Sequence, residues 1–83
     1  MNRTIQRDVA NLGYDFNDVC RCLEELTIAD YSGVYERDGL QFDVYKPRFA
    51  HGPGVDALYV KLSERSNATL PQVALGSFHL QRT

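Results

Sequence analysis

The residues best suited to chemistry in this chain are basic, aromatic and histidine side chains in its second half. They are Lys46, Arg48, Tyr59, Lys61 and His79. Lysine and arginine bind phosphate groups, and histidine takes or gives a proton near neutral pH. Tyrosine can hydrogen-bond a phosphate or stack on an unpaired base. Together these side chains suit the binding of a polyanion and proton transfer at a phosphate.

Each of these residues also has an ordinary structural explanation. Lys46 and Arg48 flank a proline, where charges protect a strand end from edge pairing. Tyr59 and Lys61 could be a solvent-facing pair on an antiparallel sheet. His79 could be an exposed histidine near the chain end, and His51, in a glycine-rich loop, is better explained as surface. Residue type alone leaves the two explanations open.

Charge is unevenly distributed along the 83 residues. Residues 1–43 carry four basic and nine acidic side chains, whereas residues 44–83 carry five basic and two acidic ones, for a net charge of −2. This asymmetry indicates a second half that faces a polyanion, with a merely solvated face as the alternative. The length allows one domain, residues 1–83.

Several classes of protein are not expected. No apolar run approaches the ~20 residues that span a bilayer, and no signal peptide is evident, so we expect a cytoplasmic protein without membrane contact. Cys20 and Cys22 are two residues apart on an expected helix and point to nearly opposite sides, so they can neither pair nor share a metal. We expect reduced thiols in or beside the core, and no metal or cofactor.

The first third of the chain has helical periodicity. Ile5, Val9 and Leu12 form one apolar stripe, and Gly13 is placed to end that helix. Asp15 is a candidate N-cap of a second helix, with Asp18 in its first turn. The expected apolar stripe of the second helix is Phe16, Val19, Cys20, Leu23 and Leu26. Thr27 could cap a further short turn.

From Tyr31 onward the pattern alternates as in strands. Asp38-Gly39 predicts a hairpin between SGVYE and LQFDVY. In the second of these strands we expect Leu40, Phe42 and Val44 to face inward and Gln41, Asp43 and Tyr45 outward. Pro47 is expected to end that strand because it cannot donate to a ladder.

The rest of the chain completes an antiparallel meander. A loop, RFAHGPGVD, precedes the strand ALYVKL, whose Leu58, Val60 and Leu62 face the core. SERSNATLP is expected to be a polar turn, and QVALGSFHL the last strand, with its buried face undecided. The prediction is an α+β domain in two layers: two or three helices within residues 1–31 on about four antiparallel strands within residues 32–83.

Read in order, NLGYDFNDVCRCLEEL, ADY, DVYKPR, LYVKL and GSFH resemble the MqsR (motility quorum-sensing regulator) family of toxins from prokaryotic type II toxin–antitoxin systems. The resemblance covers most of the chain, from about Val9 to His79. It implies a RelE-like fold of helices on a small antiparallel sheet. It also implies a cytoplasmic mRNA interferase, an endoribonuclease that needs no metal or cofactor and is silenced by a cognate antitoxin protein.

The residue-by-residue match is incomplete. Tyr59 matches the family's tyrosine, and Lys61 its following lysine. His79 stands where the family has a lysine, and Phe42 where it has a glutamine, with Gln41 one residue earlier. The family's lysine after the ADY segment is absent from residues 32–34. The chain therefore looks like a short, divergent member.

Metal-free RNA cleavage uses the RNA's own 2′-hydroxyl as nucleophile and needs proton transfer and charge stabilisation. The expected catalytic residues are His79 as general acid or base, Tyr59, and Arg48 as the transition-state cation. The expected RNA-binding residues are Lys61, Lys46, Tyr45 and Gln41. The substrate would be mRNA, free or ribosome-bound. The alternatives are a non-catalytic RNA-, ribosome- or protein-binding module, and a small interaction protein whose acidic half docks a basic partner.

Overall fold

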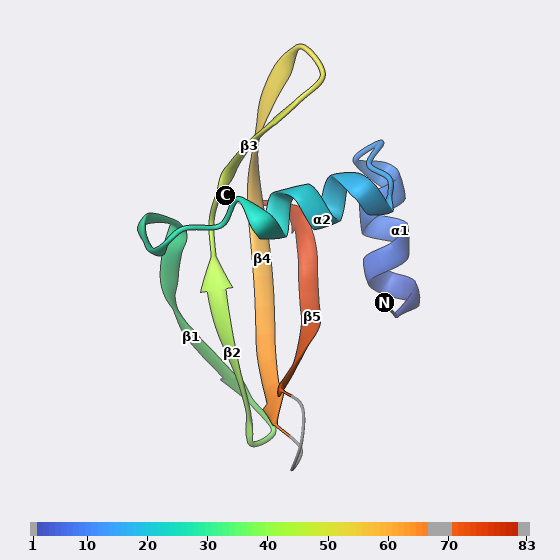
Figure 1. The fold of residues 1–83 in the computed structure, drawn as a ribbon. Helices are drawn as coiled ribbons and strands as arrows, with labels where there is room; N and C mark the ends of the chain where they lie inside the picture. Colours follow the sequence, from blue (N-terminus) through green and yellow to red (C-terminus); the bar gives the residue numbers. More distant parts are fainter. Residues whose placement is uncertain (1, 67–70, 82–83) are drawn as a thin grey trace.

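Two helices pack on a five-stranded antiparallel sheet, so the α+β prediction with N-terminal helices is confirmed (Figure 1). The computed structural model describes residues 2–66 and 71–81. Its elements are α1 (Arg3–Asn11), α2 (Phe16–Glu24), the 3-10 turn η1 (Ile28–Asp30), β1 (Tyr31–Arg37), β2 (Leu40–Tyr45), β3 (Arg48–His51), β4 (Gly54–Ser66) and β5 (Pro71–Leu80). β4 is central: it pairs with β2 and β3 along one edge and with β5 along the other.

Helix α1 forms where its apolar spacing predicts. The Asn2 side chain caps it by accepting a hydrogen bond from the Ile5 backbone N–H at 2.9 Å. Ile5 and Val9 are buried, one turn apart on the same face. Gly13 follows the helix with φ +75, a conformation that favours glycine, so the expected stop is confirmed.

Helix α2 begins at the expected cap but buries a different stripe. Asp15 and Asp18 form a capping box, each side chain accepting from the other residue's backbone N–H at 2.8 and 2.9 Å. Phe16, expected in the apolar stripe, is 66% exposed, whereas Cys22 is buried beside Val19. The stripe was wrong at these positions because the partners of α2 in the tertiary structure decide which arc it buries.

The β1–β2 hairpin is confirmed in detail. Arg37 pairs with Leu40, and the intervening Asp38 and Gly39 both have positive φ, +53 and +78. Two positive φ values are typical of the type I′ turn, whose twist matches that of the flanking strands. Asp38 tolerates this conformation better than most non-glycine residues because its short side chain can hydrogen-bond locally.

The segment after Pro47, predicted as a loop, is a second hairpin. β3 pairs with the first residues of β4, from Arg48 with Ala57 to His51 with Gly54. The Pro47 carbonyl accepts from the Leu58 N–H at 2.9 Å, so the chain stays beside β4 across the proline. Pro47 does end β2, but it interrupts the pairing with β4 rather than finishing it.

Val44 of β2 is buried and Gln41 and Asp43 are exposed, as predicted, but the helices cover the other face of the strand. Tyr45 packs against the main core under the helices. Val44 is buried but pairs with Lys61, and paired residues share a face, so Phe42 and Val44 lie on the side away from α2. Alternation separates two faces without saying which one a helix covers, and here both faces are partly covered.

A bulge in β5 explains why its buried face could not be assigned. Lys61 pairs with Ser77 and Leu62 with Leu75, which leaves Gly76 unpaired. The extra residue puts both Leu75 and Phe78 on the helix side, although strict alternation would separate them. The expected turn is also shorter than predicted, since β4 extends to Ser66; residues 67–70 lie outside the described residues.

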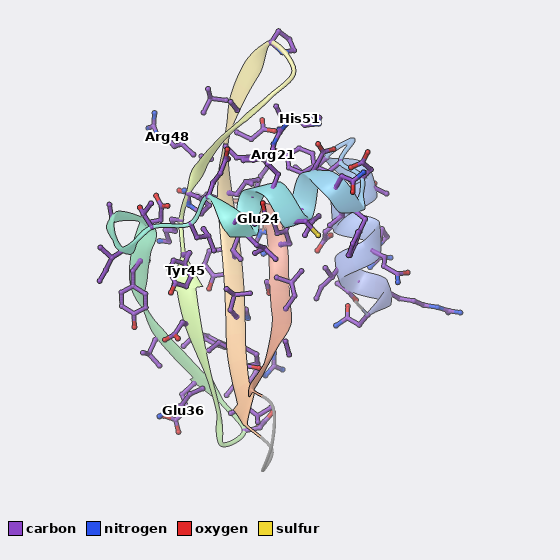
Figure 2. All side chains as sticks on the ribbon, in the orientation of Figure 1. Arg21, Glu24, Glu36, Tyr45, Arg48 and His51 are labelled. Carbon is purple, nitrogen blue, oxygen red and sulfur yellow. The ribbon has the colours of Figure 1, made fainter. Side chains whose placement is uncertain are left out.

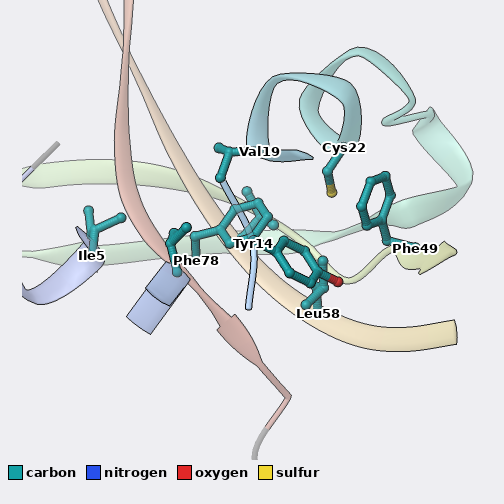
Figure 3. Close-up of a cluster of buried hydrophobic side chains, with 9 residues drawn as sticks. Ile5, Tyr14, Val19, Cys22, Phe49, Leu58 and Phe78 are labelled. Carbon is teal, nitrogen blue, oxygen red and sulfur yellow. The ribbon is translucent and has the colours of Figure 1, made fainter. Parts of the chain in front are cut away.

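The core lies between α2 and the sheet, with α1 closing it beside β5 (Figures 1 and 3). Its buried members are Ile5, Val9, Tyr14, Val19, Cys22, Phe49, Leu58, Val60 and Phe78. Burial of one large apolar side chain contributes roughly 1.5–3 kcal/mol. This packing holds α1 against β5 and so fixes what α1 presents to the opposite face of the sheet.

Candidate functional site

A hollow of about 440 Å³ lies on the sheet face away from α2. Three strands and one helix contribute to it: β1, β4, β5 and α1. It is lined by Thr4, Asp8, Tyr35, Lys46, Tyr59, Lys61, Ser77, His79 and Gln81. It therefore brings together four of the seven residues proposed from the sequence, those at positions 46, 59, 61 and 79.

His79 and Tyr59 lie side by side in the wall of this hollow. They are direct partners across β5 and β4, and their rings stack at 5.1 Å between centroids with 12° between the planes. His79 Nδ1 lies 2.7 Å from the Leu80 carbonyl oxygen. Since a carbonyl only accepts, Nδ1 carries a proton in this contact, which leaves Nε2 as the atom that exchanges protons with a ligand.

Lys61 lies two residues beyond Tyr59 on the same face of β4. Its Nζ is 4.4 Å from the centroid of the Tyr35 ring and 5.5 Å from that of Phe42. Contacts of a cation with ring faces hold the ammonium group over the sheet surface. Phe42 thus supports the position of a cation in this chain.

Lys46 reaches the hollow from the connection between β2 and β3. Its backbone N–H donates to the Asp30 carbonyl at 2.8 Å, which ties this connection to η1. Two lysines, Lys46 and Lys61, thus line the same hollow as His79. Two cations and a proton-transfer group are the side chains that cleavage of a phosphate ester requires.

The other three proposed residues lie elsewhere. Arg48 is the exposed first residue of β3 and pairs with Ala57, so it shares the face of the hollow but lines a separate recess of about 250 Å³ (Figure 2). Tyr45 contacts the Tyr31 ring at 5.5 Å on the opposite, helix-covered face. Gln41 shares that opposite face, as its alternation with Tyr45 along β2 dictates.

Sequence reasoning missed the contribution of α1 to the hollow. Thr4 and Asp8 are four residues apart and so lie on one side of that helix, adjacent to its buried stripe. The sequence does contain this polar pair at helical spacing. Only the packing of α1 against β5, however, shows that the pair lies in the same hollow as His79. The tyrosine at position 35 and the serine at position 77 were missed for the same reason.

His51, expected to be plain surface, belongs to a polar cluster on the helix side. Its ring contacts the Tyr14 ring in a tilted arrangement, 4.3 Å between centroids, and its Nε2 faces Asp18 Oδ2 at 3.3 Å. The Tyr14 hydroxyl donates to Asp56 Oδ2 at 2.6 Å. Burial and then this hydrogen bond raise the Tyr14 pKa above its usual range. The cluster joins the β3–β4 hairpin to the start of α2 (Figure 2).

Neither cysteine lies in the hollow. Cys22 is buried in the core and Cys20 half-buried, both as free thiols, as expected. Burial raises the pKa of Cys22 to about 11, so it is protonated at neutral pH. Among the described residues, no group of three histidine, cysteine or acidic side chains is arranged to hold a metal ion.

Neither described helix has the length and apolar character that crossing a membrane requires. The sequence matches no protein-family model, no curated protein and no solved structure.

Proposed function

We propose that this protein is the toxin of a toxin–antitoxin pair and acts as a metal-independent endoribonuclease on mRNA in the cytoplasm. The observation that carries the proposal is the meeting of His79, Tyr59, Lys46 and Lys61, from separate parts of the chain, in one hollow. The resemblance in DVYKPR, LYVKL and GSFH supports the same function independently of that geometry.

The residues in the hollow have distinct roles in this proposal. His79 exchanges a proton through Nε2, its Nδ1 being held by the Leu80 carbonyl. Tyr59 orients the imidazole by stacking on it and can offer its hydroxyl to a phosphate oxygen. Lys46 and Lys61 stabilise negative charge that develops on the phosphorane. Arg48, on the same face beyond Ala57, contacts the RNA backbone outside the hollow.

The test is cleavage of defined mRNA by purified protein in EDTA, with and without ribosomes, followed by mapping of the 5′ ends. The His79→Gln variant should cleave about 100-fold to 10,000-fold more slowly, the usual effect of losing a general acid or base. His51→Gln is the matched control, because His51 is the chain's other histidine and lies outside the hollow. Equal cleavage by folded His79→Gln protein would remove His79 from the mechanism.

A second candidate is a protein-binding module, and the uncovered part of the helix-side sheet face favours it. α2 crosses the sheet below the β3–β4 hairpin, and on the other side of α2 the β1–β2 surface carries no helix (Figure 1). Ile28 is 92% and Val34 60% exposed there. A hollow of about 510 Å³ separates this surface from α2, lined by Leu23, Leu26, Thr27, Ile28, Tyr31, Asp43, Tyr45 and Leu62.

The charges around this surface select its partner. Asp30, Glu36 and Asp43 surround the apolar residues, and none of them forms an ion pair with a lysine or arginine in the described part of the chain. We therefore assign the surface to a basic segment of the antitoxin that inserts apolar side chains between these acids. If the protein is a toxin, binding of this segment inhibits the enzyme. If the protein is a binding module, binding of this segment is its function.

Charge reversal tests this surface. A Glu36→Lys/Asp43→Lys variant should lose binding to the protein encoded by the adjacent gene, measured by titration calorimetry, and keep RNA cleavage. Arg37→Glu, on the other face of β1, is the control and should bind normally. Partner binding without any RNA cleavage by the wild-type protein would favour the module over the enzyme.

A further inference from the structure

Metal-free cleavage of RNA needs two proton transfers, one from the 2′-hydroxyl and one to the leaving 5′-oxygen. In the hollow, His79 supplies one exchangeable position, Nε2, because its Nδ1 is engaged with the Leu80 carbonyl. The lysines are donors only and suit charge stabilisation. A second proton-transfer group is therefore required close to the imidazole.

Asp8 meets this requirement by its position. Asp8 and His79 both line the main hollow, and both also line an adjoining recess of about 260 Å³. The two residues are therefore neighbours in both cavities. Asp8 is half-buried, and its carboxylate forms no hydrogen bond or ion pair with the described side chains, those of residues 2–63 and 74–81. A polar side chain that serves no structural contact is available to a ligand.

The packing of α1 fixes this position. Ile5 and Val9 are buried in the core at 2% and 5% exposure, which sets the rotation of the helix. Asp8 precedes Val9 and follows Thr4 by one turn, so the same rotation turns both polar residues toward β5 and the hollow. A carboxylate on a helix anchored in this way needs no rearrangement to face the substrate.

We propose that Asp8 is a catalytic residue of this protein, the general base that removes the proton of the RNA 2′-hydroxyl; this role rests on the endoribonuclease function proposed above. The 2′-oxygen attacks the adjacent phosphorus, and the new O–P bond forms as the bond from phosphorus to the 5′-oxygen breaks. The leaving 5′-oxygen takes a proton from Nε2–H of protonated His79. The products are a 2′,3′-cyclic phosphate and a 5′-hydroxyl, with Asp8 protonated and His79 neutral until the solvent restores both.

The assignment of the two roles follows from the groups themselves. A carboxylate only accepts, and an imidazolium only donates. The charged groups that face this pair are Lys46, from the β2–β3 connection, and Lys61, from β4; Tyr35 and Tyr59 supply neutral hydroxyls. The two ammonium groups balance the phosphate's charge, so a carboxylate can approach the anionic substrate without net repulsion.

The experiment compares Asp8→Asn with His79→Gln on two substrates: an ordinary dinucleotide linkage within RNA, and the same linkage with sulfur in place of the leaving 5′-oxygen. A thiolate leaves without protonation, so the sulfur substrate bypasses the general acid alone. Both variants should cleave ordinary RNA at least about 100-fold more slowly. The sulfur substrate should restore most of the rate to His79→Gln and none to Asp8→Asn.

Binding and matched variants complete the design. Asp8→Asn should bind 2′-O-methyl RNA, which cannot be cleaved, as tightly as the wild type or more tightly, because a negative charge is lost. Asp38→Asn, an exposed acid of the β1–β2 turn, should leave cleavage unchanged. Asp8→Glu retains the carboxylate and should recover part of the rate, which separates loss of the base from loss of α1 packing.

Two results would overturn the role of Asp8 while leaving the proposed function intact. One is wild-type cleavage by Asp8→Asn; the other is rescue of this variant by the sulfur substrate to the same extent as His79→Gln. Failure of the wild-type protein to cleave any RNA, free or ribosome-bound, would instead refute the endoribonuclease function itself, and the role of Asp8 with it.

Discussion

Gly76, the bulge residue of β5, packs against the Phe42 ring, which in turn contacts Lys61 of the hollow. A Cβ added at position 76 would lie 2.8 and 2.9 Å from Cε1 and Cδ1 of Phe42, against an ordinary contact of at least 3.4 Å. The Phe42 ring would have to retreat, and it is one of the two rings that hold the Lys61 ammonium group. Gly76→Ala should therefore disturb both the sheet and the hollow.

The size of the effect follows from two opposing terms. Forcing a methyl group into a packed site costs typically about 1–3 kcal/mol, and replacing a strand glycine by alanine returns roughly 0.5–1 kcal/mol of backbone entropy. The net loss expected for Gly76→Ala is about 0–2.5 kcal/mol, with a central value of about 1 kcal/mol. In a domain of this size each kcal/mol corresponds to about 4–8 °C in Tm.

The assay is thermal and urea unfolding followed by circular dichroism, together with RNA cleavage. Gly54→Ala is the matched control: Gly54 also lies in a strand, has no positive φ, and a Cβ there meets nothing within 4 Å. The control should show the backbone term alone, a stabilisation of roughly 0.5–1 kcal/mol. Equal stability of the two variants would refute the reasoning that glycine is required by the approach of Phe42.

Three further predictions concern the helices and the cysteines. Asp15→Ala removes the capping box of α2 and should cost about 0.5–2 kcal/mol in urea unfolding. The pKa of Asp18 is lowered below 3.8, first by the Asp15 backbone N–H and then by His51. This carboxylate therefore stabilises the fold above pH 3.8, and its contribution is lost in more acidic solution. The stability difference between wild type and Asp18→Asn should shrink at acidic pH, and a constant difference would contradict the assignment. Cys20 should react with a thiol reagent at pH 8 well before Cys22, whose pKa is raised to about 11 by burial; simultaneous reaction in folded protein would contradict this.

The elements that were predicted correctly depend on neighbours in the chain. The cap at Asp15, the stop at Gly13 and the hairpin at Asp38-Gly39 each rest on interactions within about four residues. The burial of Leu58 and Val60 follows from a long alternating run with only one apolar face. Local hydrogen bonds and backbone preferences are present in any fold that the chain adopts, so sequence reasoning reaches them.

The errors fall where one element depends on another that is distant in the chain. β3 was predicted to be a loop because its four residues form a strand only when β4 lies beside them. That Tyr45 packs against the core under the helices depends on where α2 crosses the sheet. The same limit applies to the hollow: four of its residues were proposed from their chemistry, whereas Asp8 was not.

The sequence by itself therefore determined the two helices with the Asp15 cap, the Asp38-Gly39 hairpin, the strands other than β3, and the residue types that could act on a phosphate. Only the tertiary structure decided that His79 stacks on Tyr59, that Arg48 lies outside their hollow, and that Asp8 lies inside it. The physical reason is that side-chain chemistry belongs to single residues, whereas a site requires several of them within reach of one ligand. That proximity is set by the packing of α1 against β5 and by the bulge at Gly76, which a local pattern does not encode.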